Sequence, residues 1–178
     1  MISDMIEEDL RSLEEMTAEL SRQANRLRDS RDRYRQQASV LAEKRNRLQQ
    51  KARELSSEAQ IYRSKRDECN QAARDAKQKR QECSDLAAGI RARGGMGDAS
   101  DARAEAQKHH QTVVKMSAEG QANHEKMCQL MDDAAKLRDE AQKCHEQFLD
   151  CKAAADSEHL KFIETVKKIE ELKNNLPD

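Results

Sequence analysis

Residues 6–48 read IEEDLRSLEEMTAELSRQANRLRDSRDRYRQQASVLAEKRNRL, and a large apolar residue stands at every seventh position of this stretch. The series starts at Ile6 and continues through Leu13, Leu20, Leu27, Tyr34, Leu41, Leu48, Leu55, Tyr62, Cys69, Ala76, Cys83 and Ile90. We label these residues d in a heptad abcdefg. The matching a positions are mostly alanine or arginine, as at Ala24, Arg31, Ala38 and Arg45. A repeat held this long keeps one stripe facing a partner only if the helices supercoil left-handedly, so it predicts a coiled coil.

The composition favours the same interpretation. Of the 178 residues, 38% are charged and 36% are apolar, and the aromatic residues are Tyr34, Tyr62, Phe148 and Phe162. Typical globular domains are about 45–50% apolar and about 25% charged, so this chain has too few bulky side chains for a compact core. A pair of long helices offers no concave, water-excluding pocket. We therefore expect no enzyme, no catalytic residue, no small-molecule substrate and no cofactor.

Glycine marks the one expected break in the helical pattern. Gly89, Gly94, Gly95 and Gly97 cluster near the midpoint of the chain, and glycine ends helices because it readily adopts positive φ. We predict a first coiled-coil helix over residues 1–91, a glycine-rich hairpin tip over 92–98, a second coiled-coil helix over 99–174 and a tail over 175–178.

So short a connection predicts an all-α fold, a long antiparallel two-helix coiled-coil hairpin. A turn near residue 95 pairs residues whose numbers add up to about 191. Two chains aligned in parallel are an open alternative, and a homodimer of hairpins is compatible with the same pattern.

The second predicted helix follows the heptad less regularly. Gly120 and Asn123 interrupt its a and d positions, and we expect any bend or fraying there. Near Ala155 the apolar stripe changes phase and continues through His159, Phe162, Val166 and Ile169. This change predicts a four-residue stutter, which locally unwinds the supercoil.

A longer repeat, A-x3-H-x2-F-[LI], occurs in full around His145 and His159 and in weaker copies around His110 and His124, and it places all four histidines at heptad position e. Histidine is a common zinc ligand, but a zinc site gathers four ligands in one coordination sphere, whereas these residues are spread over about 75 Å of helix. We therefore predict no metal site. Beside the helix interface an imidazole can instead cover apolar neighbours and hydrogen-bond to a carboxylate opposite.

The five cysteines form no CxxC pair, and four of them occupy d positions, where a free thiol behaves as a small hydrophobe. The apolar runs are three or four residues long, far short of the roughly 18 that span a bilayer, and the first residues do not form a basic and then apolar leader. These features predict a protein of the reducing cytoplasm with no membrane partner.

Charge is spread unevenly along the chain. Residues 1–21 carry seven acids against Arg11 alone, whereas residues 22–53 carry eleven Lys/Arg against three acids. Arginines at a positions should pack their stems in the interface and reach a carboxylate of the other helix, which would set the register. Other cations of the middle, with the arginines of the tip, are candidate contacts to RNA or ribosome phosphates: Arg22, Arg26, Arg28, Arg33, Arg35, Lys44, Arg47, Lys51, Arg91 and Arg93. A solvated face paired with acids is the alternative interpretation.

Two sets of repeats resemble a known family. AQKCHEQF at residues 141–148 and ADSEHLKFI at residues 155–163 resemble the A-D-x-x-H-x-x-F repeats of uncharacterised archaeal coiled-coil proteins. KRNRL at residues 44–48 and KRDEC at residues 65–69 resemble the K-R-D/N-x-Φ repeats in the front half of those proteins. That family is similar to the fungal brefeldin A resistance factor, which associates with polysomes and messenger ribonucleoprotein. The resemblance implies a partner in the translation machinery.

Two functional hypotheses follow. In the first, the chain is a non-enzymatic coiled-coil protein that associates with the ribosome or RNA through its arginine-rich middle and its hairpin tip. In the second, it is a structural or scaffolding coiled coil that mediates protein–protein interaction or self-association. Salt separates them, because binding to phosphates weakens steeply as the salt concentration rises.

Overall fold

The computed structural model describes residues 2–95 and 97–174, with side chains described over 7–95 and 99–174. Two helices account for most of these residues: α1 runs from Ile2 to Ala92 and α2 from Gly97 to Asn174. The fold is therefore all-α, as the sequence predicts. No described helix contains a segment that is long and apolar enough to cross a membrane.

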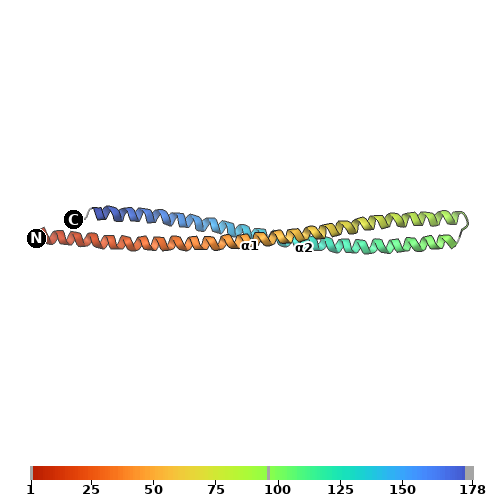
Figure 1. Cartoon of the computed structure of the whole chain (residues 1–178), viewed down its shortest axis with the longest axis horizontal. Coiled ribbons are helices and arrows are strands. Elements are labelled where there is room, and N and C mark those ends of the chain that lie inside the picture. The colour runs from red at the N-terminus through yellow and green to blue at the C-terminus, as the bar shows by residue number, and fades with distance from the viewer. Residues whose placement is uncertain (1, 96, 175–178) are drawn as a thin grey trace. The chain divides into compact units, whose positions relative to one another are not determined.

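The chain divides into two units, each built from a segment of α1 and a segment of α2 (Figure 1). Unit 1 comprises Met1–Leu48 and Asp139–Asp178, and unit 2 comprises Gln49–Arg138. The sequence predicts consecutive segments: a helix, a tip, a second helix and a tail. The two units instead each combine one segment of α1 with one segment of α2.

The two segments of each unit pack antiparallel. In unit 1, Arg45 Nη1 lies 3.2 Å from His145 Nδ1, and the Arg31 guanidinium lies over the ring of Phe162. In unit 2, Arg80 Nη1 lies 3.1 Å from His110 Nδ1. The numbers of these partners add up to between 190 and 193. The antiparallel hairpin and its expected register are thus confirmed within each unit.

The heptad pattern explains which side chains are buried. Every a and d residue of α1 between Leu10 and Ile90 is buried or half-buried. The four aromatic residues are all half-buried at a or d positions, which confirms their place in the interface. Of the thirteen buried apolar residues among those described, eleven are alanines, so the two backbones approach each other closely.

The expected stutter near Ala155 is wrong. The d positions stay in the interface beyond it: the Glu158 side chain is 18% exposed, Thr165 is 6% exposed and Leu172 is half-buried. The Thr165 hydroxyl donates a hydrogen bond to the Lys161 carbonyl oxygen, so its polar atom is satisfied within the helix. A small residue with an internally bonded hydroxyl can occupy a core position without a shift of phase.

Helix α1 ends in a Schellman motif at the predicted tip. Gly94 has a φ of 83°, its amide donates to the Arg91 carbonyl, and the Gly95 amide donates to the Ile90 carbonyl. A Cβ on Gly95 would lie 2.8 Å from Ile90 Cγ2, so glycine also allows the side chain of Ile90 to fold back over the turn.

The observed helix ends differ slightly from the predicted ones. Helix α1 extends one residue beyond the expected end, and α2 begins two residues before the expected start, so the tip is shorter than 92–98. Met96 and the predicted tail, 175–178, lie outside the described residues.

Gly120 is buried at an a position within continuous helix, so α2 does not fray at this point. A Cβ there would lie 2.9 Å from Asn70 Oδ1 and 3.5 Å from Cys69 Cβ. The nearer atom is the end of an exposed side chain, which can rotate away.

We predict that Gly94→Ala destabilises the protein by about 1–2 kcal/mol, because an L side chain is strained at positive φ. Gly89→Ala is the matched control, since Gly89 lies inside α1 and its added Cβ would meet only Arg93 Nη2, at 4.0 Å. Chemical denaturation followed by circular dichroism measures both. Equal effects of the two substitutions would contradict the turn geometry.

We predict that Gly120→Ala stabilises the protein by about 0.5–1 kcal/mol, because alanine loses less backbone entropy in a helix and Asn70 can move aside. Ala134→Gly, at a fully buried a position of the same helix, should do the reverse. A lower unfolding midpoint for Gly120→Ala would show that the close contact at this point cannot relax.

Candidate functional site

The candidate phosphate-binding side chains of the middle segment are all exposed and all lie on α1, seven of them in unit 1 and Lys51 just inside unit 2. They occupy heptad positions c, e, f and g rather than the core positions, so their charged groups reach solvent while the helix interface stays intact. The structure thus keeps eight of the predicted residues together on one helix segment: Arg22, Arg26, Arg28, Arg33, Arg35, Lys44, Arg47 and Lys51.

Three of these eight cations have a carboxylate partner on α1. Arg22 lies 2.6 Å from Glu19, Arg47 lies 3.6 Å from Glu43 and Arg28 lies 3.8 Å from Asp29. The hydrogen bond and the charge of Arg22 hold the pKa of the Glu19 carboxyl below its usual value, and Arg26 adds to this effect. Exposed pairs of this kind contribute little and open readily to another anion.

The other five cations have no ion pair within 4.0 Å to any residue whose side chain the structure describes: Arg26, Arg33, Arg35, Lys44 and Lys51. They are the side chains of this segment most readily available to an external anion.

The two tip candidates belong to unit 2 and are also exposed. Arg91 Nε lies 3.4 Å from the Ala87 carbonyl oxygen, so this side chain covers the last turn of α1. Arg93 follows the helix end, where its amide bonds the Ile90 carbonyl. The tip is therefore a separate cationic group from the α1 candidates.

The arginines at a positions point into the interface, but the expected carboxylate partners on the other helix are wrong. Arg45 donates toward His145 Nδ1 and lies 5.9 Å from the centre of the Phe148 ring. Arg31 lies 5.9 Å from the centre of the Phe162 ring and pairs with Asp32 of its own helix at 2.7 Å. An aromatic face and an imidazole nitrogen accept a guanidinium without bringing a second charge into the interface.

Unit 2 repeats the arrangement with the other two arginines. Arg80 Nη1 lies 3.1 Å from His110 Nδ1, and Arg66 Nη1 lies 3.9 Å from Met127 Sδ. Arg66 also donates to Asp67 of its own helix. Each a-position arginine therefore contacts one copy of the H-x-x-Φ repeat of α2.

Two histidines of that repeat, His110 and His145, accept from arginine, and they do not hydrogen-bond to a carboxylate opposite as the sequence suggested. The His145 ring stacks on Phe148 at 6.1 Å between centroids, and His159 stacks on Phe162 at 6.5 Å. In the fourth copy, His159 Nδ1 is buried with no hydrogen-bond partner in the described part of the chain, because Arg31 turns to Asp32.

A signal for this pairing was present in the sequence. Along α1 the four arginines are separated by 14, 21 and 14 residues, and along α2 the four histidines show the same spacings. This series reads the same in both directions, so it fits parallel and antiparallel helices alike, but between antiparallel helices all four pairs match in only one register.

The unequal spacing also disfavours the neighbouring antiparallel registers. Sliding α2 by one heptad in either direction would place all four histidines opposite alanines at a positions of α1, drawn from Ala24, Ala38, Ala52, Ala59, Ala73 and Ala87. A slide by two heptads restores only two of the four matches. The polar contacts therefore select one register from several that the apolar pattern alone would allow.

Metal ligands do not converge in the part of the chain that the structure describes: it contains no group of three or more His, Cys, Asp or Glu side chains placed to hold an ion. His124 Nε2 and Cys128 Sγ are 3.7 Å apart on one helix face, without further ligands there. All five cysteines are free thiols.

A comparison with protein families gives one match. The model of a family described as "Family of unknown function (DUF7121)" matches residues 91–177, just under half of the chain. The matched region is similar to that family and contains the tip arginines and all four histidines of the repeat. Comparisons with curated proteins and with solved structures find no match.

We predict that Arg45→Ala destabilises the protein by about 1–2 kcal/mol, because it removes a hydrogen bond and a cation–π contact from the interface. In a double-mutant cycle with His145→Ala, the coupling energy should be about 0.5–1 kcal/mol. Arg47→Ala, two residues away with a side chain that is 80% exposed, should change the stability by less than about 0.5 kcal/mol. Strictly additive effects at positions 45 and 145 would contradict the proposed contact.

Proposed function

We propose that this protein is a non-enzymatic coiled-coil protein of the cytoplasm that binds RNA, as presented by a ribosome or another ribonucleoprotein, through the exposed cations of α1 and the tip. The observation that carries the proposal is a set of five exposed cations that form no ion pair with any side chain the structure describes: Arg26, Arg33, Arg35, Lys44 and Lys51. Uncompensated cations along one helix segment favour a polyanion with regularly spaced charges.

The spacing of these side chains suits a phosphate backbone. Arg26, Arg33 and Arg47 share heptad position c; Arg26 and Arg33 are about 10 Å apart along the helix, and Arg47 lies about 21 Å beyond Arg33, with Val40 at the c position between them. Lys44 and Lys51 lie beside them at position g. Such a row tracks a backbone without reading base edges, so the proposed binding is driven by charge and depends weakly on RNA sequence.

The aromatic residues support backbone binding over base stacking. Tyr34, Tyr62, Phe148 and Phe162 are half-buried between the helices, and two of them already carry an arginine. They are therefore engaged in the interface. Contacts to phosphates are the means of binding that the exposed surface supports best.

The resemblance of the arginine and histidine repeats to archaeal coiled-coil proteins, which are similar to a polysome-associated factor, is consistent with this proposal. It supplies the ribosome as the first partner to test. The match to a family of unknown function assigns no partner of its own.

We predict that the protein cosediments with ribosomes or ribosomal RNA at about 50 mM salt and is released at about 200 mM, because phosphate contacts exchange with counterions. Replacing Arg26, Arg33, Arg35, Lys44 and Lys51 with glutamine should weaken binding at least tenfold. The same changes should reduce the slope of log affinity against log salt by up to about 3.5 for a single strand.

The matched control neutralises five exposed cations of unit 2, Arg63, Lys65, Arg74, Lys77 and Lys79, which changes the net charge equally. It should retain most of the affinity. Replacing Arg91 and Arg93 by glutamine in a separate variant measures how much the tip contributes to the affinity for RNA. Absence of cosedimentation at low salt, or equal losses in the two five-residue variants, would contradict the proposal.

A scaffolding coiled coil is the second candidate function. It is favoured by exposed apolar side chains outside the interface, such as Val40, which is 60% exposed, and Met16, which is 51% exposed. Cosedimentation that survives high salt and nuclease treatment would support this candidate in place of RNA binding.

A further inference from the structure

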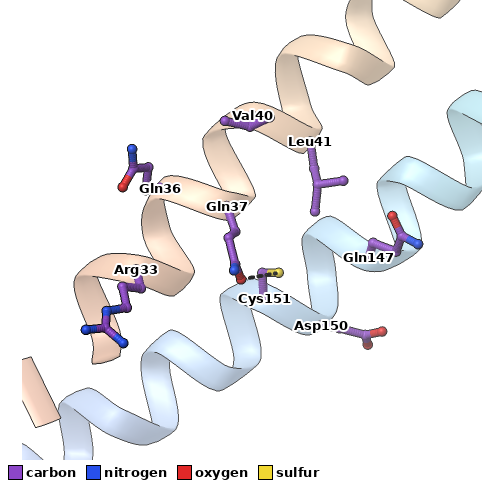
Figure 2. Close-up of a pocket in the computed structure, with 8 residues that line it drawn as sticks. All are labelled: Arg33, Gln36, Gln37, Val40, Leu41, Gln147, Asp150 and Cys151. Carbon is purple, nitrogen blue, oxygen red and sulfur yellow. Dashed lines mark hydrogen bonds between the residues drawn. The ribbon is translucent and has the colours of Figure 1, made fainter. Parts of the chain in front are cut away.

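Two apolar grooves lie on the same side of unit 1, between α1 and α2. The first, of about 660 Å³, is lined by Val40 and Leu41 of α1 and Cys151 of α2, together with glutamine side chains (Figure 2). Figure 2 shows Leu41 directed toward α2 and the Gln37 amide group meeting the Cys151 thiol, at 3.9 Å. The second groove, of about 470 Å³, is lined by Met16, Leu20 and Leu172.

The rims of the two grooves differ in charge. Arg33 of α1 and Asp150 of α2 border the first groove, and Arg33 lies within the segment of α1 that is rich in cations. Glu19 and Glu171 border the second, and Lys168 is the one cation that lines it. In both grooves most lining residues stand at heptad positions c, d and g, so the two grooves open on one flank.

We call the g and c positions of α1 on this flank the Met16–Val40 face. It consists of Asp9, Ser12, Met16, Glu19, Gln23, Arg26, Ser30, Arg33, Gln37, Val40, Lys44, Arg47 and Lys51. Its two apolar residues, Met16 and Val40, are exposed, and each lines one of the grooves. Acidic residues lie toward one end of the face and cations toward the other.

This order is self-complementary about a point near residue 28. When a second copy is laid antiparallel on the face, residues whose numbers add up to 56 oppose each other. Met16 then meets Val40, and Asp9 meets Arg47. The pattern extends to the whole segment: residues 7–23 carry six acids and two cations, and the opposing residues 33–49 carry five cations and one acid.

We propose that the Met16–Val40 face is the interface of a homodimer, in which two copies of the chain pack antiparallel about a two-fold axis near residue 28. Each copy inserts Val40 into the groove of Met16, Leu20 and Leu172 of the other copy. Each also places its acidic segment along the cationic segment of the other. A two-fold axis makes both contacts occur twice, which is how closed dimers use one self-complementary patch.

The opposite orientation is disfavoured by charge. A parallel copy in register would place acids 7–19 against the same acids and the cationic segment against itself, and like charges in juxtaposition oppose association. On α2 the antiparallel arrangement brings Lys161, at position g, opposite Glu164, at position c, of the second copy. The antiparallel arrangement therefore places opposite charges against each other on both helices.

This inference is independent of the proposed RNA binding. It uses the apolar grooves and the acidic end, which phosphates would not occupy, but it also covers the cations of the face: Arg26, Arg33, Lys44, Arg47 and Lys51. RNA and a second copy would therefore compete for part of the cationic segment, while Arg28, Arg35 and the tip arginines stay accessible to RNA.

Sedimentation velocity of the nuclease-treated full-length protein over about 1–100 µM tests the proposal. We expect a dimer of twice 20.4 kDa, and we expect Val40→Asp to raise the dissociation constant at least tenfold. Ile61→Asp is the matched control, because Ile61 is 56% exposed at the same heptad position c in unit 2, and it should leave the dimer unchanged.

A charge swap tests the orientation. Asp9→Arg and Arg47→Asp should each weaken the dimer, and the double variant D9R/R47D should restore it, since the two changes recreate the pair with reversed signs. Both positions are exposed, and circular dichroism at 222 nm checks that each variant is folded.

A wild-type monomer throughout the concentration range would overturn the proposal. Equal effects of Val40→Asp and Ile61→Asp, or a charge swap that does not restore association, would also overturn it. RNA binding by the variant with five glutamines tests only the proposed function. A dimer that persists after nuclease treatment and is lost in Val40→Asp tests only this interface.

Discussion

The fold depends on how closely two backbones can approach when the residues between them are small. Eleven alanines supply most of the buried apolar side chains among the described residues, and Gly120 lies against the Cys69–Asn70 segment of the opposite helix. A buried methyl group contributes less than 1 kcal/mol by transfer. Stability therefore accumulates from many short contacts along each helix pair, with the larger d residues filling the spaces beside the alanines.

An alanine-rich interface selects its register only weakly, because one alanine fits opposite a given site as well as the next. The arginines at a positions add the missing selection. Each guanidinium, such as that of Arg45, meets a histidine, aromatic or methionine side chain of α2 and often a carboxylate or amide of its own helix. The unequal spacing of these contacts means that a slipped pairing loses at least half of them.

This division of roles leaves the outer surface free for other partners. The a-position arginines are used within the helix pair, whereas the cations at c, e, f and g are exposed. The same cationic segment can meet RNA phosphates or, as the Met16–Val40 face suggests, the acidic segment of a second copy. Such shared use would couple self-association to RNA binding, since both draw on Arg33, Lys44 and Arg47.

The sequence alone determined the coiled coil, the position of the turn and the approximate register, because each follows from a local rule: a seven-residue period, a glycine cluster and a rise per residue. It also placed the aromatic residues between the helices. It misjudged the region beyond Ala155, where Thr165 is buried at d, since hydropathy does not register that a hydroxyl can bond its own helix.

Only the tertiary structure decided what the arginines and histidines do. Their heptad positions are visible in the sequence, but whether Arg45 reaches a carboxylate, an imidazole or a ring depends on which residue of α2 lies opposite. The two apolar grooves have the same origin, because each is formed by side chains from both helices, such as Leu41 with Cys151. A local pattern fixes the face on which a residue lies, and its contacts are fixed only when the second helix is in place.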